Sequence, residues 1–183
     1  NSVNRMMKLV DQIMDFSKLE TDALNLSLCE CDAADMFGGI VSAFRYNCAH
    51  KGIELEVSET FDGRKVLLDA DKFEKILNNL MSNAVKYTQQ GSVTLKVYCR
   101  QINEEYITLC FSVTDTGIGI KEEDLAKLFD SFKRLDLNKN RTIQGSGLGL
   151  NIAKQLVELM NGTITVKSKY GEGSTFNVYI PQK

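Results

Sequence analysis

Apolar and polar residues alternate along two stretches in the second half of the chain, and this alternation limits the fold more than any other feature. The two stretches are 93–99 and 107–113, and the polar segment 101–105 between them is suited to a hairpin loop. Alternation with a period of two is typical of a strand that buries one face and exposes the other. The pattern therefore predicts an antiparallel hairpin with one buried face.

Helical and strand patterns on either side of this hairpin predict the rest of a layered domain. The expected helices are 33–51, a long helix that opens at 71 and ends before Gly91, 122–129 and 148–160. The further strands are expected near 53–57, 66–68, 164–166 and 176–180. Asp71 is expected to cap the long helix, with Glu74 three residues later. Together these elements predict an α+β fold, a two-layer α/β sandwich with helices on one face of a mixed, mostly antiparallel sheet.

Residues 1–20 differ in character from the domain that follows. Their apolar residues recur at spacings of three and four on more than one stripe, which is typical of a helix inside a bundle. Residues 21–32 are polar and irregular, and we interpret them as a linker to a domain at 33–183. An unpaired bundle helix exposes apolar surface, so one expectation is a homodimer through residues 3–20.

Composition and cysteine spacing exclude several classes of protein. With 22 basic and 24 acidic residues the formal charge is −2, so no basic excess indicates nucleic-acid binding. No apolar run in the sequence approaches the roughly 18 residues that span a bilayer. The five cysteines lack regular spacing, and Cys29 and Cys31 have no matching second pair, so we expect reduced thiols and no zinc site. Whether Cys99 and Cys110 lie opposite each other across the hairpin is not decided by the periodicity.

Polar side chains recur on one side of the long expected helix. They are Asn79, Asn83, Lys86 and Tyr87, at offsets of four, seven and eight residues, and the apolar residues form a separate stripe. A neutral amide oxygen suits a Mg²⁺ ion that keeps water and phosphate oxygens as its other ligands, and a nearby lysine offsets phosphate charge. The alternative is an ordinary solvated helix face, which one asparagine pair alone would favour.

A glycine-bearing turn follows the second alternating strand directly. It reads Asp115-Thr116-Gly117-Ile118-Gly119. Glycines let the backbone turn sharply and approach a ligand. A carboxylate at the base of a pocket can accept a hydrogen bond from the exocyclic amine of adenine. Guanine has a carbonyl instead, which could not donate this hydrogen bond. The alternative is a turn that only ends a strand.

A second glycine-rich run opens the last expected helix. It reads Gly145-Ser146-Gly147-Leu148-Gly149-Leu150. Helix N-termini present N–H groups and partial positive charge, which suit phosphates. The run is not a Rossmann fingerprint, because no strand leads into it, and not a Walker A loop, because no Gly-Lys-Ser/Thr follows. The alternative is a flexible linker, which the leucines argue against.

Two shorter segments add further candidates. Phe129 and Phe132 are three residues apart, a spacing typical of core residues, and Arg134 ends a basic pair that could reach a phosphate or a partner. A tight turn expected near 171–173 leads into the last strand, where the hydroxyl of Thr175 is a candidate contact.

Taken in order, these segments resemble the N, G1, F, G2 and G3 boxes of sensor histidine kinases, over roughly residues 35–181. The ordered set is far more specific than any single box. The resemblance implies the Bergerat ATP-binding sandwich, which gyrase-type ATPases and some chaperones share. It also implies that residues 1–20 are part of the second helix of a dimerisation and phosphotransfer bundle.

The resemblance implies ATP and Mg²⁺ as cofactors and gives each box a role. Asn83 resembles the Mg²⁺ ligand, and Asn79 a catalytic position that contacts the nucleotide. Phe132 and Arg134 resemble catalytic residues that couple phosphotransfer to a lid at 133–146. The other nucleotide-binding positions that it implies are Lys86, Tyr87, Asp115, Gly117, Ile118, Gly119, Phe129, Gly145, Ser146, Gly147, Leu148, Gly149, Leu150 and Thr175.

The resemblance favours a kinase whose acceptor lies outside the sequence. Asn79 stands where hydrolysing relatives tend to have glutamate, and an amide cannot take a proton from water. The only histidine, His50, lies in no acceptor motif, so we expect a fragment that does not autophosphorylate alone. The implied partners are the phosphoacceptor helix of its own bundle or of a dimer mate, and the receiver domain of a response regulator. The implied setting is the cytoplasmic part of a membrane-anchored bacterial protein.

Two other functions are compatible with the same boxes. The chain could bind ATP as a nucleotide sensor and transfer nothing, or phosphorylate serine as kinases among the anti-sigma factors do. The complete set of boxes favours an enzyme over a sensor. The bundle-like residues 3–20 argue against a serine-directed kinase.

Overall fold

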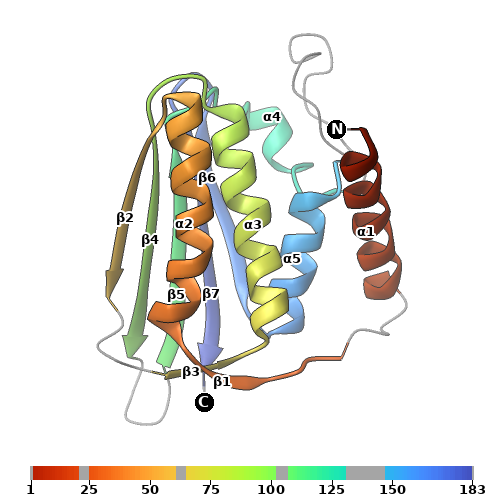
Figure 1. The fold of residues 1–183 in the computed structure, drawn as a ribbon. Helices are drawn as coiled ribbons and strands as arrows, with labels where there is room; N and C mark the ends of the chain where they lie inside the picture. The colour runs from red at the N-terminus through yellow and green to blue at the C-terminus, as the bar shows by residue number, and fades with distance from the viewer. Residues whose placement is uncertain (1, 21–24, 61–64, 102–106, 131–146, 183) are drawn as a thin grey trace.

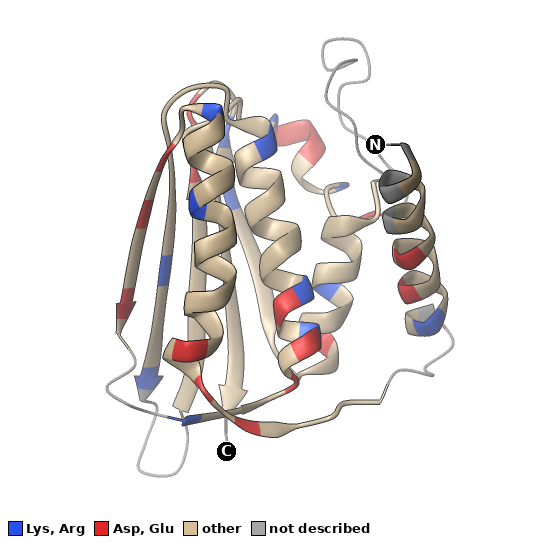
Figure 2. Ribbon diagram, viewed as in Figure 1, with Lys and Arg blue, Asp and Glu red and all other residues tan. Residues whose placement is uncertain are grey.

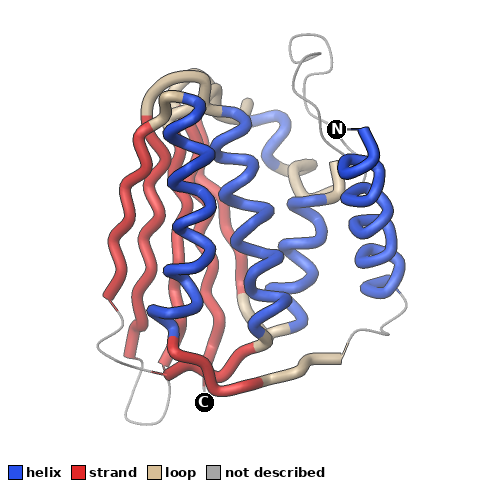
Figure 3. The backbone as a smooth tube through the Cα atoms, in the orientation of Figure 1, coloured by secondary structure: helices blue, strands red, loops and turns tan. Residues whose placement is uncertain are grey.

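Helices lie against one face of a five-stranded sheet in the computed structural model (Figures 1 and 3). The model describes residues 2–20, 25–60, 65–101, 107–130 and 147–182. The helices are α1 (Ser2–Glu20), α2 (Ala33–Lys51), α3 (Ala70–Tyr87), α4 (Glu122–Leu125) and α5 (Gly149–Leu159). The strands are β1 (Cys29–Asp32), β2 (Glu54–Thr60), β3 (Lys65–Leu68), β4 (Ser92–Gln101), β5 (Ile107–Asp115), β6 (Thr163–Lys169) and β7 (Gly173–Gln182). The predicted α+β sandwich is confirmed.

The main sheet has the strand order β2-β4-β5-β7-β6. β2 pairs with β4 in parallel and the other pairs are antiparallel, so the sheet is mixed and mostly antiparallel, as predicted. In the β4–β5 hairpin the buried Val97 lies opposite the buried Phe111, which confirms the alternation. Tyr98 lies opposite Cys110, so Cys99 and Cys110 point to opposite faces and form no disulfide.

A second, two-stranded sheet is not predicted by the sequence. β1 pairs with β3 in antiparallel fashion at the entrance to the domain. Three of the four residues of β1 are exposed, so no apolar alternation marks this strand in the sequence. The expectation of irregular structure is therefore wrong for residues 29–32.

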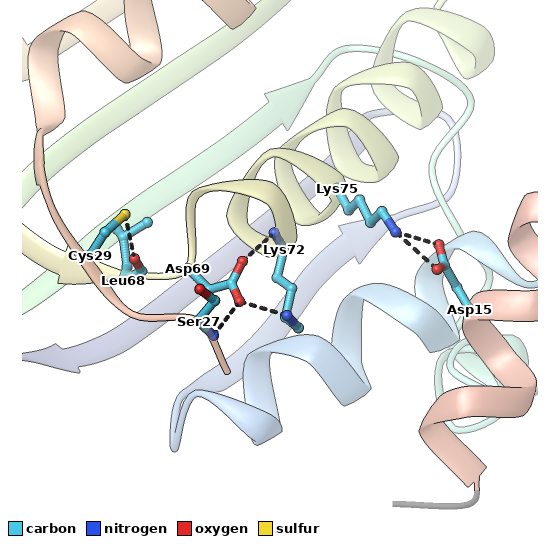
Figure 4. Close-up of polar contacts among 7 residues, drawn as sticks. All are labelled: Asp15, Ser27, Cys29, Leu68, Asp69, Lys72 and Lys75. Atoms are coloured by element: carbon cyan, nitrogen blue, oxygen red, sulfur yellow. Dashed lines mark hydrogen bonds and ion pairs between the residues drawn. The ribbon is translucent and has the colours of Figure 1, made fainter. Parts of the chain in front are cut away.

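The cap of α3 also differs from the predicted one. Asp69, rather than the exposed Asp71, is the N-cap, and its Oδ1 accepts a hydrogen bond from the backbone N–H of Lys72 at 3.1 Å. Asp69 Oδ2 accepts from the Ser27 N–H at 2.8 Å and from Lys72 Nζ at 2.5 Å (Figure 4). Asp69 therefore ties the segment before β1 to the first turn of α3.

Three phenylalanine rings connect the helices to the sheet. Phe37 on α2 contacts Phe73 on α3 edge-to-face, with ring centroids 5.0 Å apart, and Phe73 contacts Phe111 on β5 at 5.3 Å. All three side chains are fully buried. The buried stripe of α3 is the predicted one: Phe73, Ile76, Leu77, Leu80, Met81 and Ala84.

α1 packs beside α5 and keeps an apolar face that the described residues do not cover. An ion pair joins Asp15 Oδ2 to Lys75 Nζ of α3 at 2.8 Å (Figure 4), and Phe16 and Leu19 are partly buried against the core. The exposed apolar side chains of α1 include Val3, Met6, Met7, Leu9, Val10, Ile13 and Met14. Within the described ranges, no helix combines the length and the apolar character that crossing a membrane requires.

The two edges of the main sheet carry opposite charges. β2 forms one edge and carries three exposed acidic residues, Glu54, Glu56 and Glu59 (Figure 2). β6 forms the other edge and carries the exposed Lys167 and Lys169. The sheet therefore ends in an acidic strand on one side and a basic strand on the other.

Phe73→Ala should lower the free energy of unfolding by about 3–5 kcal/mol, because it leaves a cavity between α2 and β5. Denaturant unfolding measures this loss. Tyr46→Ala removes a ring that is 73% exposed, so it should change the same quantity by less than about 0.5 kcal/mol. Equal effects of the two changes would contradict the central role of Phe73.

The pKa of Asp69 lies below its ordinary value. Burial alone would raise it, but the hydrogen bond from the Lys72 ammonium and those from the Ser27 and Lys72 N–H groups outweigh burial. A carboxyl whose pKa is depressed in the folded state adds stability above its unfolded pKa of about 3.9. That stability is lost as the pH falls through the lower, folded pKa.

Asp69→Asn should lower the free energy of unfolding at neutral pH and reduce its loss in acid. Asparagine keeps one acceptor oxygen for the cap, but it loses both the charge and the second acceptor, which binds the Ser27 N–H and the Lys72 ammonium. Urea unfolding at a series of pH values from neutral down to below pH 4 measures both effects. The matched control is Asp71→Asn in the same turn, which should leave neutral-pH stability nearly unchanged. An Asp69→Asn protein as stable as the wild type at neutral pH would refute the charge effect.

Candidate functional site

The polar side of α3 forms one wall of the candidate site. Asn79, Asn83, Lys86 and Tyr87 are half-buried and lie beside the buried stripe, as their offsets predict. Lys86 Nζ donates to Tyr87 Oη at 3.1 Å and lies 4.6 Å from the centroid of the Tyr87 ring. This contact holds a positive charge near the C-terminal end of α3.

Asp115 ends β5 and is the buried carboxyl of the site. Its exposed fraction is 6%, and its Oδ1 accepts the N–H of Gly117 at 2.9 Å. Burial raises the pKa of Asp115 above its ordinary value, although the N–H groups of Gly117 and Ser174 act in the opposite direction. A buried acceptor suits a ligand that brings N–H donors, because each such bond offsets lost hydration.

The turn after this carboxyl is wedged between the end of α3 and the end of β6. A methyl group on Gly117 would lie 2.4 Å from the carbonyl oxygen of Tyr87. Gly119 has a φ of 65°, and a methyl group there would lie 2.0 Å from the carbonyl oxygen of Lys169. The Ile118 N–H donates to the Tyr87 carbonyl at 3.3 Å. Glycine is needed at both positions, and it lets the turn touch α3.

A lysine from α2 binds the same end of α3. Lys51 Nζ donates to the carbonyl oxygens of Val85, Lys86 and Thr88 at 2.5, 3.2 and 2.7 Å. Burial lowers the pKa of Lys51. The last carbonyls of a helix have no partner within it, so the ammonium satisfies them and offsets their partial negative charge. No motif in the sequence marks this lysine.

The start of α5 approaches the middle of α3. α5 begins at Gly149, where a methyl group would lie 2.8 Å from Oδ1 of Asn79. Leu148 is buried, Leu150 is partly buried against the core, and Gly147 is half-buried. The first turn of α5, whose N–H groups lack partners within the helix, therefore lies beside Asn79.

The segment after α4 is attached to α5. The carbonyl of the half-buried Phe129 accepts a hydrogen bond from Asn151 Nδ2 at 2.8 Å, and Leu128 is buried. α4 ends at Leu125, earlier than predicted, because the backbone N–H groups that follow bond three residues back. The predicted site residues outside the described ranges are Phe132, Arg134, Gly145 and Ser146, with the predicted lid at 133–146.

The last strand presents a different hydroxyl from the predicted one. Thr175 lies opposite Thr114, and their Oγ1 atoms are 3.0 Å apart. Ser174 lies opposite Asp115 and is buried on the face that the helices cover. Because neighbouring residues of a strand point to opposite faces, Thr175 points away from Asp115. The nucleotide contact of Thr175 stays a prediction, and the buried Ser174, two residues before the buried Phe176, is the hydroxyl on the same face as Asp115.

The donors on α3 fit Mg²⁺ of the kind that accompanies phosphate groups. No group of three or more His, Cys, Asp or Glu side chains that could cage a metal exists within the described ranges. Mg²⁺ at phosphate sites keeps several waters and takes one or two protein ligands beside phosphate oxygens. The amide oxygen of Asn83, one turn before Lys86, is a ligand of that type.

A comparison with protein families decides the kind of fold that carries this site. Residues 68–183 match the model described as Histidine kinase-, DNA gyrase B-, and HSP90-like ATPase. The chain belongs to this family. The match begins at the end of β3 and includes Asn79, Asp115 and Gly149, the three residues that anchor the walls of the site.

Similar proteins place the chain among the sensor histidine kinases of this ATPase family. It is 35% identical over 185 residues to the autoinducer 2 sensor kinase/phosphatase LuxQ of Vibrio parahaemolyticus, and 36% identical over 186 residues to the circadian input-output histidine kinase CikA of Synechococcus elongatus. Both alignments cover 100% of this chain but only 22% and 24% of those proteins. Full-length ShkA in complex with AMPPNP superposes with a TM-score of 0.80 at 28% identity, covering 98% of this chain and 36% of that one. The chain is the ATP-binding domain of a sensor histidine kinase.

The structure brings most of the predicted histidine kinase boxes together around α3. The turn at 115–119 touches the end of α3 through Gly117, and the start of α5 touches its middle through Gly149. Ser174 brings the last strand beside Asp115. Phe129 reaches this assembly only through α5.

Gly117→Ala should lower the free energy of unfolding by more than about 1 kcal/mol, because its methyl group meets the backbone of Tyr87. Gly38→Ala is the matched control, since nothing lies within 4 Å of a methyl group there, within α2. That change should raise stability by about 0.4–1 kcal/mol. Thermal unfolding measures both, and a neutral Gly117→Ala would show that the turn does not need its close approach to α3.

Proposed function

We propose that this domain holds ATP with Mg²⁺ and positions the γ-phosphoryl group for transfer to a histidine outside the sequence. The observation that carries the proposal is that the turn after the buried Asp115 touches the end of α3, while the start of α5 touches Asn79 on the same helix. The close approaches of Gly117 and Gly149 fix the turn and the start of α5 relative to α3.

The adenine end of the site is built on Asp115. Its carboxylate would accept a hydrogen bond from the exocyclic amine of adenine. That hydrogen bond would stabilise the charged form of Asp115, which burial disfavours. Guanine has a carbonyl oxygen at the same place, which a carboxylate repels. Ser174 and the backbone of Ile118 line the same end of the site, since the serine lies opposite Asp115.

The phosphate end lies between α3 and the first turn of α5. Lys86 and Tyr87 offer an ammonium and a hydroxyl to phosphate oxygens, and the N–H groups at Gly149 and Leu150 belong to a helix N-terminus. Mg²⁺ held by Asn83 would neutralise charge on the phosphates. Phe132, Arg134, Gly145 and Ser146 are proposed to cover this end, with Gly147 and Leu148 as the hinge.

Asn79 favours transfer over hydrolysis. Phosphoryl transfer mainly requires that a protein position the reactants and offset charge. An amide beside Gly149 can orient a phosphate or a water but cannot remove a proton from water. The γ-phosphoryl group would therefore wait for a delivered nucleophile.

The acceptor and the partners are proposed to lie outside this sequence. His50, the only histidine, is exposed at the end of α2 and stacks at a tilt on Tyr46, with ring centroids 6.4 Å apart. A phosphoacceptor helix from the same bundle or a dimer mate would supply the histidine, and a receiver domain would take the phosphoryl group onward. The exposed face of α1 supports pairing in a homodimer. The setting proposed is the cytoplasmic part of a membrane-anchored bacterial sensor.

Calorimetry with ATP, GTP and Mg²⁺ tests the adenine pocket. Asp115→Asn should weaken ATP binding roughly ten- to hundredfold, because a hydrogen bond to a charged group contributes about 1.5–3 kcal/mol. It should also narrow the preference over GTP, since an asparagine NH₂ can donate to the guanine carbonyl. Asp35→Asn, an exposed acidic residue in the first turn of α2, is the control and should bind as the wild type does. Equal binding of ATP and GTP by the folded wild type would refute the pocket.

Transfer is tested by adding the acceptor segment of the parent protein to this domain with γ-labelled ATP. The wild type should label the acceptor, whereas Asn83→Ala, folded by circular dichroism, should lose most of the labelling because its Mg²⁺ ligand is gone. ATP binding without any labelling would favour the nucleotide sensor over the kinase.

A further inference from the structure

Two cysteines lie side by side on β1, outside the nucleotide site. The Sγ atoms of Cys29 and Cys31 are 3.0 Å apart, because residues two apart on a strand point to the same face. Cys29 lies opposite Leu68 of β3, and its Sγ is 3.5 Å from the carbonyl oxygen of Leu68 (Figure 4). The pairing of β1 with β3 therefore holds the two sulfur atoms in contact.

The pair is accessible to small molecules, unlike the buried cysteines of the chain. Cys29 is exposed and Cys31 is half-buried, whereas Cys48 and Cys110 are buried. Burial raises the pKa of the thiols of both Cys48 and Cys110, which keeps them protonated and unreactive. The chain thus contains its own reference thiols for any test of the exposed pair.

We propose that Cys29 and Cys31 form a redox-active dithiol that closes to an intramolecular disulfide by exchange with a small-molecule disulfide. The geometry supports this step, because a sulfur that has reacted with the small disulfide would have a second thiol already in contact with it. The site is independent of the proposed nucleotide chemistry, since β1 carries none of the residues of that site.

The exchange takes two steps. A Cys29 thiolate attacks one sulfur of the small disulfide, the S–S bond of that molecule breaks, and the departing thiolate takes up a proton. Cys31 then loses its proton to solvent, its sulfur attacks Cys29 Sγ, and the second small thiolate leaves and is protonated. The two cysteines together lose two electrons and two protons, which the small disulfide gains as it becomes two thiols.

The electrostatics of the pair set this order of attack. The pKa of Cys31 is raised to about 11, first by its hydrogen bond with Cys29 and then by burial and by the charge of Cys29. Cys31 therefore keeps its proton while Cys29 reacts. Once Cys29 is in a mixed disulfide it no longer has the thiolate that takes part in this hydrogen bond, so the main cause of the raised pKa is removed and Cys31 can react in turn.

The closed form should be easy to reduce. Two residues of an extended strand span about 6.6 Å between Cα atoms, near the upper limit of about 6.8 Å for a disulfide. Closing the bond would bend β1 against its pairing with β3, and strained, exposed disulfides are the labile ones. A reversible exchange, rather than a permanent structural bond, follows from this geometry.

The test incubates the reduced protein without oxygen in a mixture of oxidised and reduced glutathione, then blocks remaining thiols and digests with trypsin. The tryptic peptide 19–45 contains Cys29 and Cys31 and no other cysteine. It should lose the mass of two hydrogen atoms and escape blocking, while the peptides with Cys48, Cys99 and Cys110 are blocked. Excess reduced glutathione should restore the thiols.

Single substitutions separate the role of Cys29, which attacks the small disulfide, from that of Cys31, which then attacks Cys29. Cys31→Ser should stop at a mixed disulfide of Cys29 with glutathione, and Cys29→Ser should react far less. Either a wild-type peptide 19–45 that is blocked as fully as the reference peptides, or one that accumulates only the mixed disulfide, would overturn the proposal. A disulfide that excess reduced glutathione does not reduce would contradict the proposed reversible exchange.

Discussion

The carbonyl groups at the C-terminal end of α3 need partners from outside the helix, and the chain supplies them from two distant segments. Lys51, at the end of α2, binds the carbonyls of Val85, Lys86 and Thr88, and the turn after β5 brings the N–H of Ile118 to Tyr87. A helix end without such partners would be costly to bury. Because the turn that follows Asp115 is bound there, the proposed adenine and phosphate ends of the site would share one support.

The opposite end of α3 is tied to the N-terminal segments. Asp69 binds Ser27 and Lys72 while it caps the helix, and Asp15 of α1 pairs with Lys75 one turn further on (Figure 4). Of these contacts, the exposed pair of Asp15 and Lys75 is the weaker, since solvent screens it. α1 is thus attached through a screened ion pair and the packing of Phe16 and Leu19, whereas residue 27 is bound by a buried carboxyl.

Sequence patterns predicted the features that depend on local periodicity and missed those that depend on distant partners. The buried stripe of α3 and the alternation of β4 and β5 follow from spacing alone, and both are confirmed. The strand at residues 29–32 could not be predicted, because its pairing partner lies about 40 residues away. The cap was placed two residues too late, because Asp69 and Asp71 are both suitable capping residues. The face of each hydroxyl on β7 follows from strand parity, which places Ser174 rather than Thr175 on the side of Asp115.

The charges on the sheet edges affect how copies of this domain meet. An edge strand has unpaired backbone groups that invite another strand. Two β2 edges would bring Glu54, Glu56 and Glu59 of both copies together, and two β6 edges would bring lysines together, so like edges repel. A β2 edge and a β6 edge are complementary in charge instead, although Glu172 already pairs with Lys169, and their contact would be head-to-tail rather than two-fold. Salt in solution weakens both the repulsion between like edges and the attraction between unlike edges, so these charges act mainly at low ionic strength.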